Sequence, residues 1–351
     1  MASPAPPNLF PDLRCEDVLQ FQHSVWYPIF ARIAIKAKTI RPLPLEFSQY
    51  MHDDRVMVPE GSENILAESY LSDSESASDE HEDQDETRPP HYSFPELDAQ
   101  IRAVIEEYDA VFPKLNFTSP QDSMWLLPSS TPLKCTSPAD VYLILKSSDF
   151  VTHDLLASSV FEDCVDFIPE IDSQYELELV LKKWYSMDRS REFRCFVREG
   201  RLIGITQRDP VYYEYLTDVS NSNKIRSAIL KLWTAEIEPR WPHPDYIVDL
   251  LLTRNLEKGH IVDLNPYGPK TDPVLFSFED LRDLMETSSQ ELPVFRVIDS
   301  PSHPLVNRNA PKHQHNMVPL DALAFGSGQD PKSLSRNLAD AIMQSVRSDN
   351  V

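Results

Sequence analysis

The amino-acid sequence predicts an α+β protein built from short β-hairpins and amphipathic helices. Residues 192–207 and 246–265 each contain two apolar, β-branched runs separated by a polar turn, which is typical of a hairpin. Residues 94–108 and 223–233 carry apolar side chains at helical spacing, which predicts helices. A third observation is residues 71–86, which hold eight acids and four serines and predict a disordered insert.

The composition excludes several classes of protein. A chain of 351 residues with 41% hydrophobic residues suggests two or three domains with a sizeable core. A net charge of −23 argues against a nucleic-acid-binding surface, although it allows a nucleotide in a locally positive cleft or a basic protein partner. Four cysteines without a CxxC pair argue against zinc and fit a reducing compartment. With no signal peptide and no 18-residue apolar run, we expect a cytoplasmic protein without membrane contact.

The first elements are rich in aromatic residues. Residues 17–30 predict a helix whose apolar side either packs in the core or forms a partner surface, and residues 33–40 predict a strand. The serines of the 71–86 insert lie upstream of acids, so the insert is either a phosphorylation site or a plain solubilising segment.

Two lysines stand within apolar runs in the middle of the chain. Lys114 follows Phe112 and precedes Phe117, so it either reaches to water from an edge strand or faces a phosphate. Lys134 lies in a second run of this kind. Residues 138–145 predict a helix opened by Ser137 or Pro138. Residues 175–184 predict a strand with Leu177, Leu179 and Leu181 on one face and Glu178 and Lys182 on the other.

The hairpin over 192–207 turns at Glu199–Gly200 and carries an arginine between apolar residues. Glu192 and Arg194 share one face of the strand. Arg194 is therefore either in a structural salt bridge with Glu192 or a phosphate-binding side chain, and the residues leave both open.

The hairpin over 246–265 gathers oxygen ligands. Asp249 lies within one strand, and Asp263 and Asn265 share a face of the other, about 7 Å apart. Buried carboxylates are destabilising unless they are paired or bound to metal, and Mg²⁺ prefers oxygen ligands of this kind. The alternative is that these acids end their strands and contact water.

The rest of the chain predicts a helix over 276–285, a loop over 300–318 and a terminal helix over 331–346, and a short run, Phe295-Arg-Val-Ile, lies between the first two.

The order of these motifs resembles the ATP-grasp fold, in which ATP lies between two α+β subdomains. It is most similar to the cell division cycle protein 123 family, over about residues 15–278. Seven blocks carry the resemblance, namely Trp26-Tyr-Pro, Phe112-Pro-Lys-Leu-Asn, Leu145-Lys-Ser-Ser-Asp-Phe, Glu178-Leu-Val-Leu-Lys-Lys-Trp, Glu192-Phe-Arg-Cys-Phe-Val, Gly204-Ile-Thr-Gln-Arg-Asp and Asp263-Leu-Asn-Pro-Tyr-Gly.

The resemblance implies an ATP-binding chaperone, monomeric on its own, that assembles eukaryotic translation initiation factor 2 by engaging its gamma subunit. It implies Mg²⁺ at Asp249, Asp263 and Asn265. It places the nucleotide at Lys114, Asn116, Phe117, Lys182, Lys183, Trp184, Glu192, Arg194 and Arg208. We divide the chain into an N-terminal subdomain (1–70), the acidic insert (71–91), a central subdomain (92–185), a C-terminal subdomain with the Mg²⁺ site (186–290) and an extension (291–351).

One departure from the ATP-grasp superfamily bears on catalysis. Its ligases close a glycine-rich loop over the phosphates, whereas residues 118–133 contain no glycine. This favours an assembly chaperone over a ligase that activates a carboxylate as an acyl phosphate. A third and weaker hypothesis is an acidic scaffold that binds no nucleotide, which a nucleotide titration would distinguish from the other two. The sequence shows no catalytic residue for the ligase reaction.

Deletion of residues 71–86 should leave the melting temperature and the ATP affinity nearly unchanged, because the segment has no apolar residues beyond Leu71 and Ala77 to pack. Differential scanning fluorimetry and calorimetric titration of the deletion variant test this. A loss of several degrees in melting temperature would show that the segment docks on the folded protein.

Overall fold

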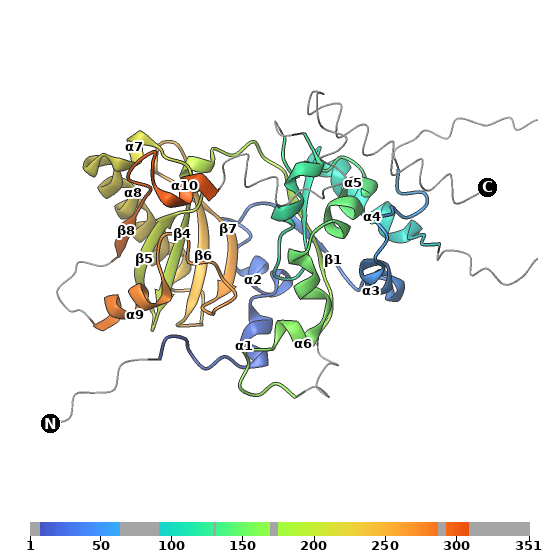
Figure 1. Cartoon of the computed structure of the whole chain (residues 1–351), viewed down its shortest axis with the longest axis horizontal. Helices are drawn as coiled ribbons and strands as arrows, with labels where there is room; N and C mark the ends of the chain where they lie inside the picture. The colour runs from blue at the N-terminus through green and yellow to red at the C-terminus, as the bar shows by residue number, and fades with distance from the viewer. Residues whose placement is uncertain (1–7, 64–90, 129–130, 169–174, 287–292, 309–351) are drawn as a thin grey trace, which may run out of the picture.

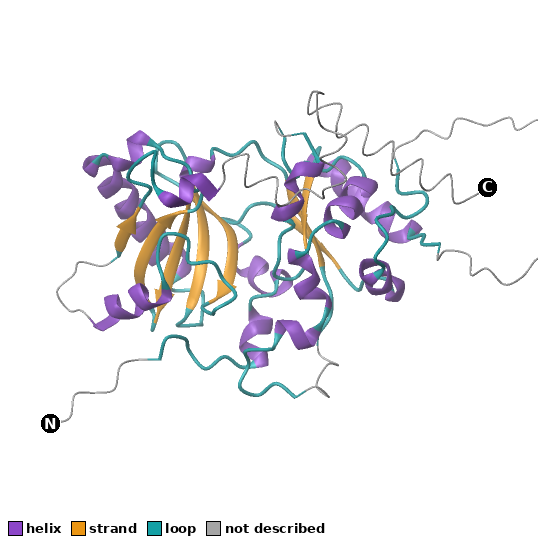
Figure 2. Ribbon diagram, viewed as in Figure 1, coloured by secondary structure: helices purple, strands orange, loops and turns teal. Residues whose placement is uncertain are grey.

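The computed structural model describes residues 8–63, 91–128, 131–168, 175–286 and 293–308. Over these residues the chain forms two β-sheets, each with its own helices, set side by side (Figures 1 and 2). The predicted insert over 71–86 and the predicted terminal helix over 331–346 lie outside the described residues. Within the described residues, no helix is long and apolar enough to cross a bilayer.

The smaller sheet has three antiparallel strands in the order β1 (Ala37–Ile40), β3 (Leu179–Lys183) and β2 (Val111–Lys114). One face packs Leu179 and Leu181 against α3 (Leu45–His52), α4 (Pro95–Tyr108) and α5 (Pro138–Lys146). Lys182 lies on the opposite face, as the predicted alternation requires, and reaches the second sheet. The strand predicted over 175–184 is thus confirmed over its second half.

The larger sheet contains both predicted hairpins, which are confirmed. Its strand order is β7 (Gly259–Pro266), β6 (Tyr246–Leu252), β4 (Glu192–Arg198), β5 (Arg201–Gln207) and β8 (Val294–Arg296), with only β5 and β8 parallel. The turn between β4 and β5 falls at Glu199 and Gly200, which both have a positive φ. These hairpins bring residues far apart in sequence into register across the sheet.

Helices cover both faces of the larger sheet (Figure 1). One face packs Phe193 and Cys195 against α2 (His23–Phe30), α8 (Val219–Leu232) and the π-helical turn Trp233–Ile237. The other face packs Phe196 against α9 (Phe278–Glu286). Arg194 shares this second face, because side chains alternate along a strand. Shorter helical segments are α1 (Cys15–Gln20), α6 (Ala157–Val160), α7 (Glu214–Thr217), α10 (Pro304–Arg308), η1 (Gln121–Leu126), η2 (Phe150–Leu155) and η4 (Arg189–Arg191).

Two predictions near the N-terminus are wrong in detail. The single helix expected over 17–30 is two helices, α1 and α2, because Gln22 is extended between them. This break lets Phe21 and Trp26 enter the same core beside the larger sheet. The strand expected over 33–40 is confined to β1, and the preceding residues instead join the larger sheet. The Ile35 amide donates to the Ile261 carbonyl over 3.0 Å, so this segment connects the two sheets.

Helix α5 begins at the predicted place, with Ser137 as its N-cap and Pro138 in its first turn. The Ser137 hydroxyl accepts from the Asp140 amide over 3.0 Å, and the Asp140 carboxylate accepts from the Ser137 amide over 3.0 Å. This reciprocal pair is a capping box.

Replacing Ser137 with alanine should lower the free energy of unfolding by about 1 kcal/mol, because one amide at the start of the helix loses its acceptor. Urea denaturation of Ser137→Ala, beside Ser220→Ala at an exposed position of α8, measures the difference. Equal stability of the two variants would contradict the capping role.

Candidate functional site

An open pocket of about 640 Å³ lies between the two sheets. The larger sheet and the loop after β7 form one wall, and the segments after β2 and around η2 form the other. Residues from α1 and α6 complete its rim. The lining residues that matter below are Phe117, Thr118, Arg194, Arg208, Asp249, Asp263 and Asn265.

Strand register brings the predicted oxygen ligands together. Asp249 lies opposite Arg194 on β4 and opposite Asp263 on β7. Directly opposite residues share a face, so the three side chains converge on the pocket. Asn265 lies two residues beyond Asp263 and lines the same pocket. The structure therefore places Asp249, Asp263 and Asn265 together, as the hairpin pattern predicted.

Asp249 is held by two arginines. Arg194 donates to both of its carboxylate oxygens, over 2.8 Å from Nε and 2.7 Å from Nη2, and Arg208 Nε lies 3.7 Å away. Burial alone would lower the pKa of Arg194, but the Asp249 carboxylate outweighs burial and raises it. The suggested salt bridge of Arg194 to Glu192 is wrong. Residues two apart on a strand lie about 7 Å apart, whereas directly opposite residues on neighbouring strands lie about 5 Å apart.

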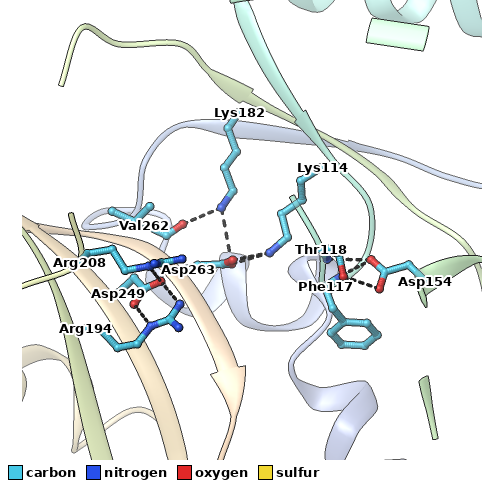
Figure 3. Close-up of polar contacts among 10 residues, drawn as sticks. All are labelled: Lys114, Phe117, Thr118, Asp154, Lys182, Arg194, Arg208, Asp249, Val262 and Asp263. Carbon is cyan, nitrogen blue, oxygen red and sulfur yellow. Dashed lines mark hydrogen bonds and ion pairs between the residues drawn. The ribbon is translucent and has the colours of Figure 1, made fainter. Parts of the chain in front are cut away.

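Asp263 is held by two lysines from the smaller sheet (Figure 3). Lys114 Nζ lies 2.7 and 2.6 Å from the two carboxylate oxygens, and Lys182 Nζ lies 3.5 Å from one of them. Lys182 also donates to the Val262 carbonyl over 2.6 Å. Lys114 is 2% exposed, so its side chain does not reach to water.

The pKa values follow from this pairing. Burial favours the neutral form of Asp263, but Lys114 and Lys182 outweigh it and lower the pKa of the carboxyl to about 2. Burial lowers the pKa of Lys182 to about 8, although Asp263 opposes the shift. Burial raises the pKa of Glu192, and Asp249 adds to the effect.

We name these six side chains the charged cluster: Lys114, Lys182, Arg194, Arg208, Asp249 and Asp263. In this cluster four cations pair with two carboxylates between the sheets of an acidic protein. The pocket is also lined by Asp149, Asp163, Asp272 and Lys270, so it carries charges of both signs. Within the described residues, no group of three or more His, Cys, Asp and Glu side chains is arranged to hold a metal ion. A cation here would therefore rely on Asp249, Asp263 and the Asn265 amide, completed by water or phosphate, which suits Mg²⁺ rather than zinc.

Several predicted nucleotide residues are not among the described residues that line the pocket, namely Lys114, Asn116, Lys182, Lys183, Trp184 and Glu192. Asn116 is buried, and its side chain donates to the Glu176 carbonyl and accepts from the Glu178 amide. Lys183 Nζ lies over the rings of Tyr108 and Tyr185. Trp184 donates to the Pro132 carbonyl, and its ring lies beneath Lys134. Glu192 is half-buried at the start of β4.

Sequence reasoning missed two buried polar residues beside the charged cluster. His23 has its Nδ1 2.9 Å from the Thr39 hydroxyl, and burial, with Lys182 and Lys114 nearby, lowers its pKa to about 2. The imidazole is therefore neutral at physiological pH. Asp154 accepts hydrogen bonds from residues 117 and 118 (Figure 3). His23 and Asp154 both lie within apolar runs. No spacing in the sequence distinguishes these two residues from ordinary core residues.

The family model D123 matches residues 26–326 of the chain. The chain is 35% identical over 318 residues to the translation initiation factor eIF2 assembly protein of Schizosaccharomyces pombe, covering 89% of this chain and 92% of that protein. It is 30% identical over 343 residues to cell division cycle protein 123 of Candida glabrata, covering 94% and 93% respectively.

The solved structure of Cdc123 from Schizosaccharomyces pombe has a TM-score of 0.66 to this chain at 34% identity. The match covers 83% of this chain and 100% of that one. The family predicted from the seven sequence blocks is confirmed, and with it an α+β fold that this chain shares with Cdc123.

Replacing Asp249 with alanine should destabilise the protein by about 3–5 kcal/mol, because it leaves buried Arg194 without its carboxylate. The double variant Arg194→Met, Asp249→Leu should recover much of this loss, since it removes both charges. Guanidinium denaturation of the three proteins measures the differences. Unchanged stability of Asp249→Ala would contradict the ion pair.

Proposed function

Because the chain belongs to the D123 family, we propose that it is an ATP- and Mg²⁺-binding assembly factor for eukaryotic translation initiation factor 2 that engages the gamma subunit of that factor. The relative from Schizosaccharomyces pombe carries the name of such an assembly protein. The observation that carries the nucleotide part is the charged cluster. Arg194, Arg208, Asp249 and Asp263 of this cluster line the pocket, and Lys114 and Lys182 of the smaller sheet pair with Asp263 behind it.

The charged cluster suits a magnesium–triphosphate pair because its cations can bind the phosphates and its carboxylates can bind the metal ion. Lys114, Lys182, Arg194 and Arg208 would bind phosphate oxygens, and Asp249, Asp263 and Asn265 would hold Mg²⁺. Without nucleotide, Asp263 is paired with Lys114 and Asp249 with Arg194, so neither buried carboxylate lacks a partner. In a complex with Mg²⁺-ATP, the cations would contact phosphate oxygens in place of the carboxylates. The carboxylates would contact Mg²⁺ in place of the cations. Phe117 would form the apolar wall beside them.

Bound ATP would act as a structural ligand that fixes the two sheets relative to each other. Lys114 and Lys182 come from the smaller sheet, whereas Arg194, Asp249 and Asp263 come from the larger one. A ligand that binds only the native arrangement stabilises it by about 2.7 kcal/mol at a hundredfold excess over its dissociation constant. A gamma-subunit surface that contacts both sheets would therefore bind more tightly when ATP is present.

The backbone around the pocket offers few donors for a γ-phosphate, which favours slow ATP hydrolysis over the chemistry of a ligase. Residues 118–133 contain no glycine. The amides of Phe117 and Thr118 already donate to Asp154, over 2.8 and 2.7 Å, so neither is available to a γ-phosphate. Phosphoryl transfer depends on donors that stabilise the charge of the transition state. We infer a protein that binds ATP without needing to hydrolyse it.

Asp263→Asn and Asp249→Asn should each weaken Mg²⁺-dependent ATP binding by about tenfold or more, because a carboxylate ligand of a hard cation is lost. Isothermal titration calorimetry, with and without Mg²⁺, measures this for protein shown to be folded by circular dichroism. Asp245→Asn is the matched control, since Asp245 pairs with Arg198 beside the same sheet and away from the pocket. Unchanged Mg²⁺-ATP affinity in both pocket variants would refute the metal assignment.

The partner assignment has its own test. Purified gamma subunit should bind the full-length chain in pull-down and calorimetry, and an unrelated GTP-binding protein should not. If the purified gamma subunit does not bind in the presence of Mg²⁺-ATP, the partner assignment is refuted. The assignment of the nucleotide site is not affected by that result.

A further inference from the structure

We propose that Asp154 is a positioning residue of the nucleotide pocket. Its carboxylate occupies an anion site made by the backbone amides of residues 117 and 118, which fixes Phe117 in the pocket wall and withholds both amides from bound phosphate. This inference rests on the proposed nucleotide site and adds to it a residue that none of the sequence motifs contains.

Asp154 lies at the end of η2 and is fully buried. One carboxylate oxygen accepts from the amides of Phe117 and Thr118, over 2.8 and 2.7 Å. The other accepts from the Thr118 hydroxyl over 2.9 Å and lies 3.0 Å from Nδ1 of His153. Among the described residues, no lysine or arginine forms an ion pair with Asp154. The negative charge is therefore held mainly by backbone and hydroxyl donors.

Consecutive backbone amides that point at one oxygen form an anion-binding concavity, the device that phosphate-binding loops use. Here the concavity is occupied by a carboxylate of the same chain. Hydrogen bonds to an ionised acceptor are about twice as strong as neutral ones, so phosphate would have to displace a well-bound competitor. A bound triphosphate therefore meets the side-chain cations of the charged cluster and not these amides.

Residues 117 and 118, which Asp154 holds, form part of the pocket wall. Phe117 and Thr118 line it together with Arg194 and Arg208. The Phe117 ring packs against the core beside the larger sheet and against the apolar cluster around α6. Lys114, three residues earlier, pairs with Asp263. Asp154 thus holds a short segment that forms part of the pocket wall and follows β2, the strand that carries Lys114.

The sign of the change in affinity separates positioning from simple electrostatics. Asp154 brings a negative charge to a segment that lines the pocket, so neutralising it would strengthen ATP binding if charge alone mattered. Loss of positioning would instead weaken binding, because Phe117 would no longer be held in the pocket wall. Positioning also predicts faster amide exchange at residues 117 and 118 in the absence of any nucleotide.

The experiment compares Asp154→Asn and Asp154→Ala with Asp140→Ala. Asp140 is a matched control because its carboxylate also accepts from a threonine amide, a threonine hydroxyl and the following amide, in residues 136 and 137 away from the pocket. Hydrogen–deuterium exchange of nucleotide-free protein and calorimetric titration with Mg²⁺-ATP are the two measurements.

We expect Asp154→Ala to weaken Mg²⁺-ATP binding by about tenfold or more, Asp154→Asn to weaken it less because the amide oxygen still accepts, and Asp140→Ala to leave it unchanged. Exchange at residues 115–119 should rise only in the Asp154 variants. Should Asp154→Ala fail to fold, Asp154→Asn carries the comparison.

Affinity in the Asp154 variants that equals or exceeds that of the wild type would overturn the inference, as would unaltered exchange at residues 115–119. If the wild-type protein itself does not bind Mg²⁺-ATP, the proposed function fails instead, and the exchange data still decide whether Asp154 holds the segment.

Discussion

The contact of Lys114 and Lys182 with Asp263 is the interaction on which the arrangement of the two sheets depends. Both lysines lie on the smaller sheet and the carboxylate lies on the edge strand of the larger one. Removing such charges from water is unfavourable unless each is paired, so the sheets are held at the distance that lets the pairs form. Backbone hydrogen bonds of Ile33 and Ile35 to Ile261 lie on the same edge strand and reinforce this junction.

This junction gathers charges of both signs inside an acidic protein. The chain carries a formal charge of −23, yet burial and register collect four cations around two carboxylates between the sheets. Low exposure strengthens these interactions and limits screening by salt. Under the proposed function, such a site would suit a polyanion that brings its own divalent cation, because that ligand satisfies charges of both signs. Net charge alone therefore says little about what the interior of a protein can bind.

Much of the local structure could be predicted from the sequence because local spacing determines it. Both hairpins, α4 and the Ser137 cap of α5 follow from alternation, helical periodicity and capping residues. The convergence of Asp249, Asp263 and Asn265 followed from alternation within one hairpin. The partner of Arg194 could not be predicted, since it is set by the register between β4 and β6, which are far apart in sequence. The roles of His23 and Asp154 depend on tertiary contacts that leave no periodic pattern.

The central claim is that ATP acts as a structural ligand joining the two sheets, and not as a source of energy through hydrolysis. The most direct measurement is the affinity for the gamma subunit of initiation factor 2 with Mg²⁺-ATP, with a non-hydrolysable analogue and without nucleotide, beside a phosphate-release assay. The account predicts that ATP and the analogue strengthen binding to a similar degree while phosphate release stays slow. Binding that requires ATP and is absent with a tightly bound analogue, or fast turnover without the partner, would contradict it.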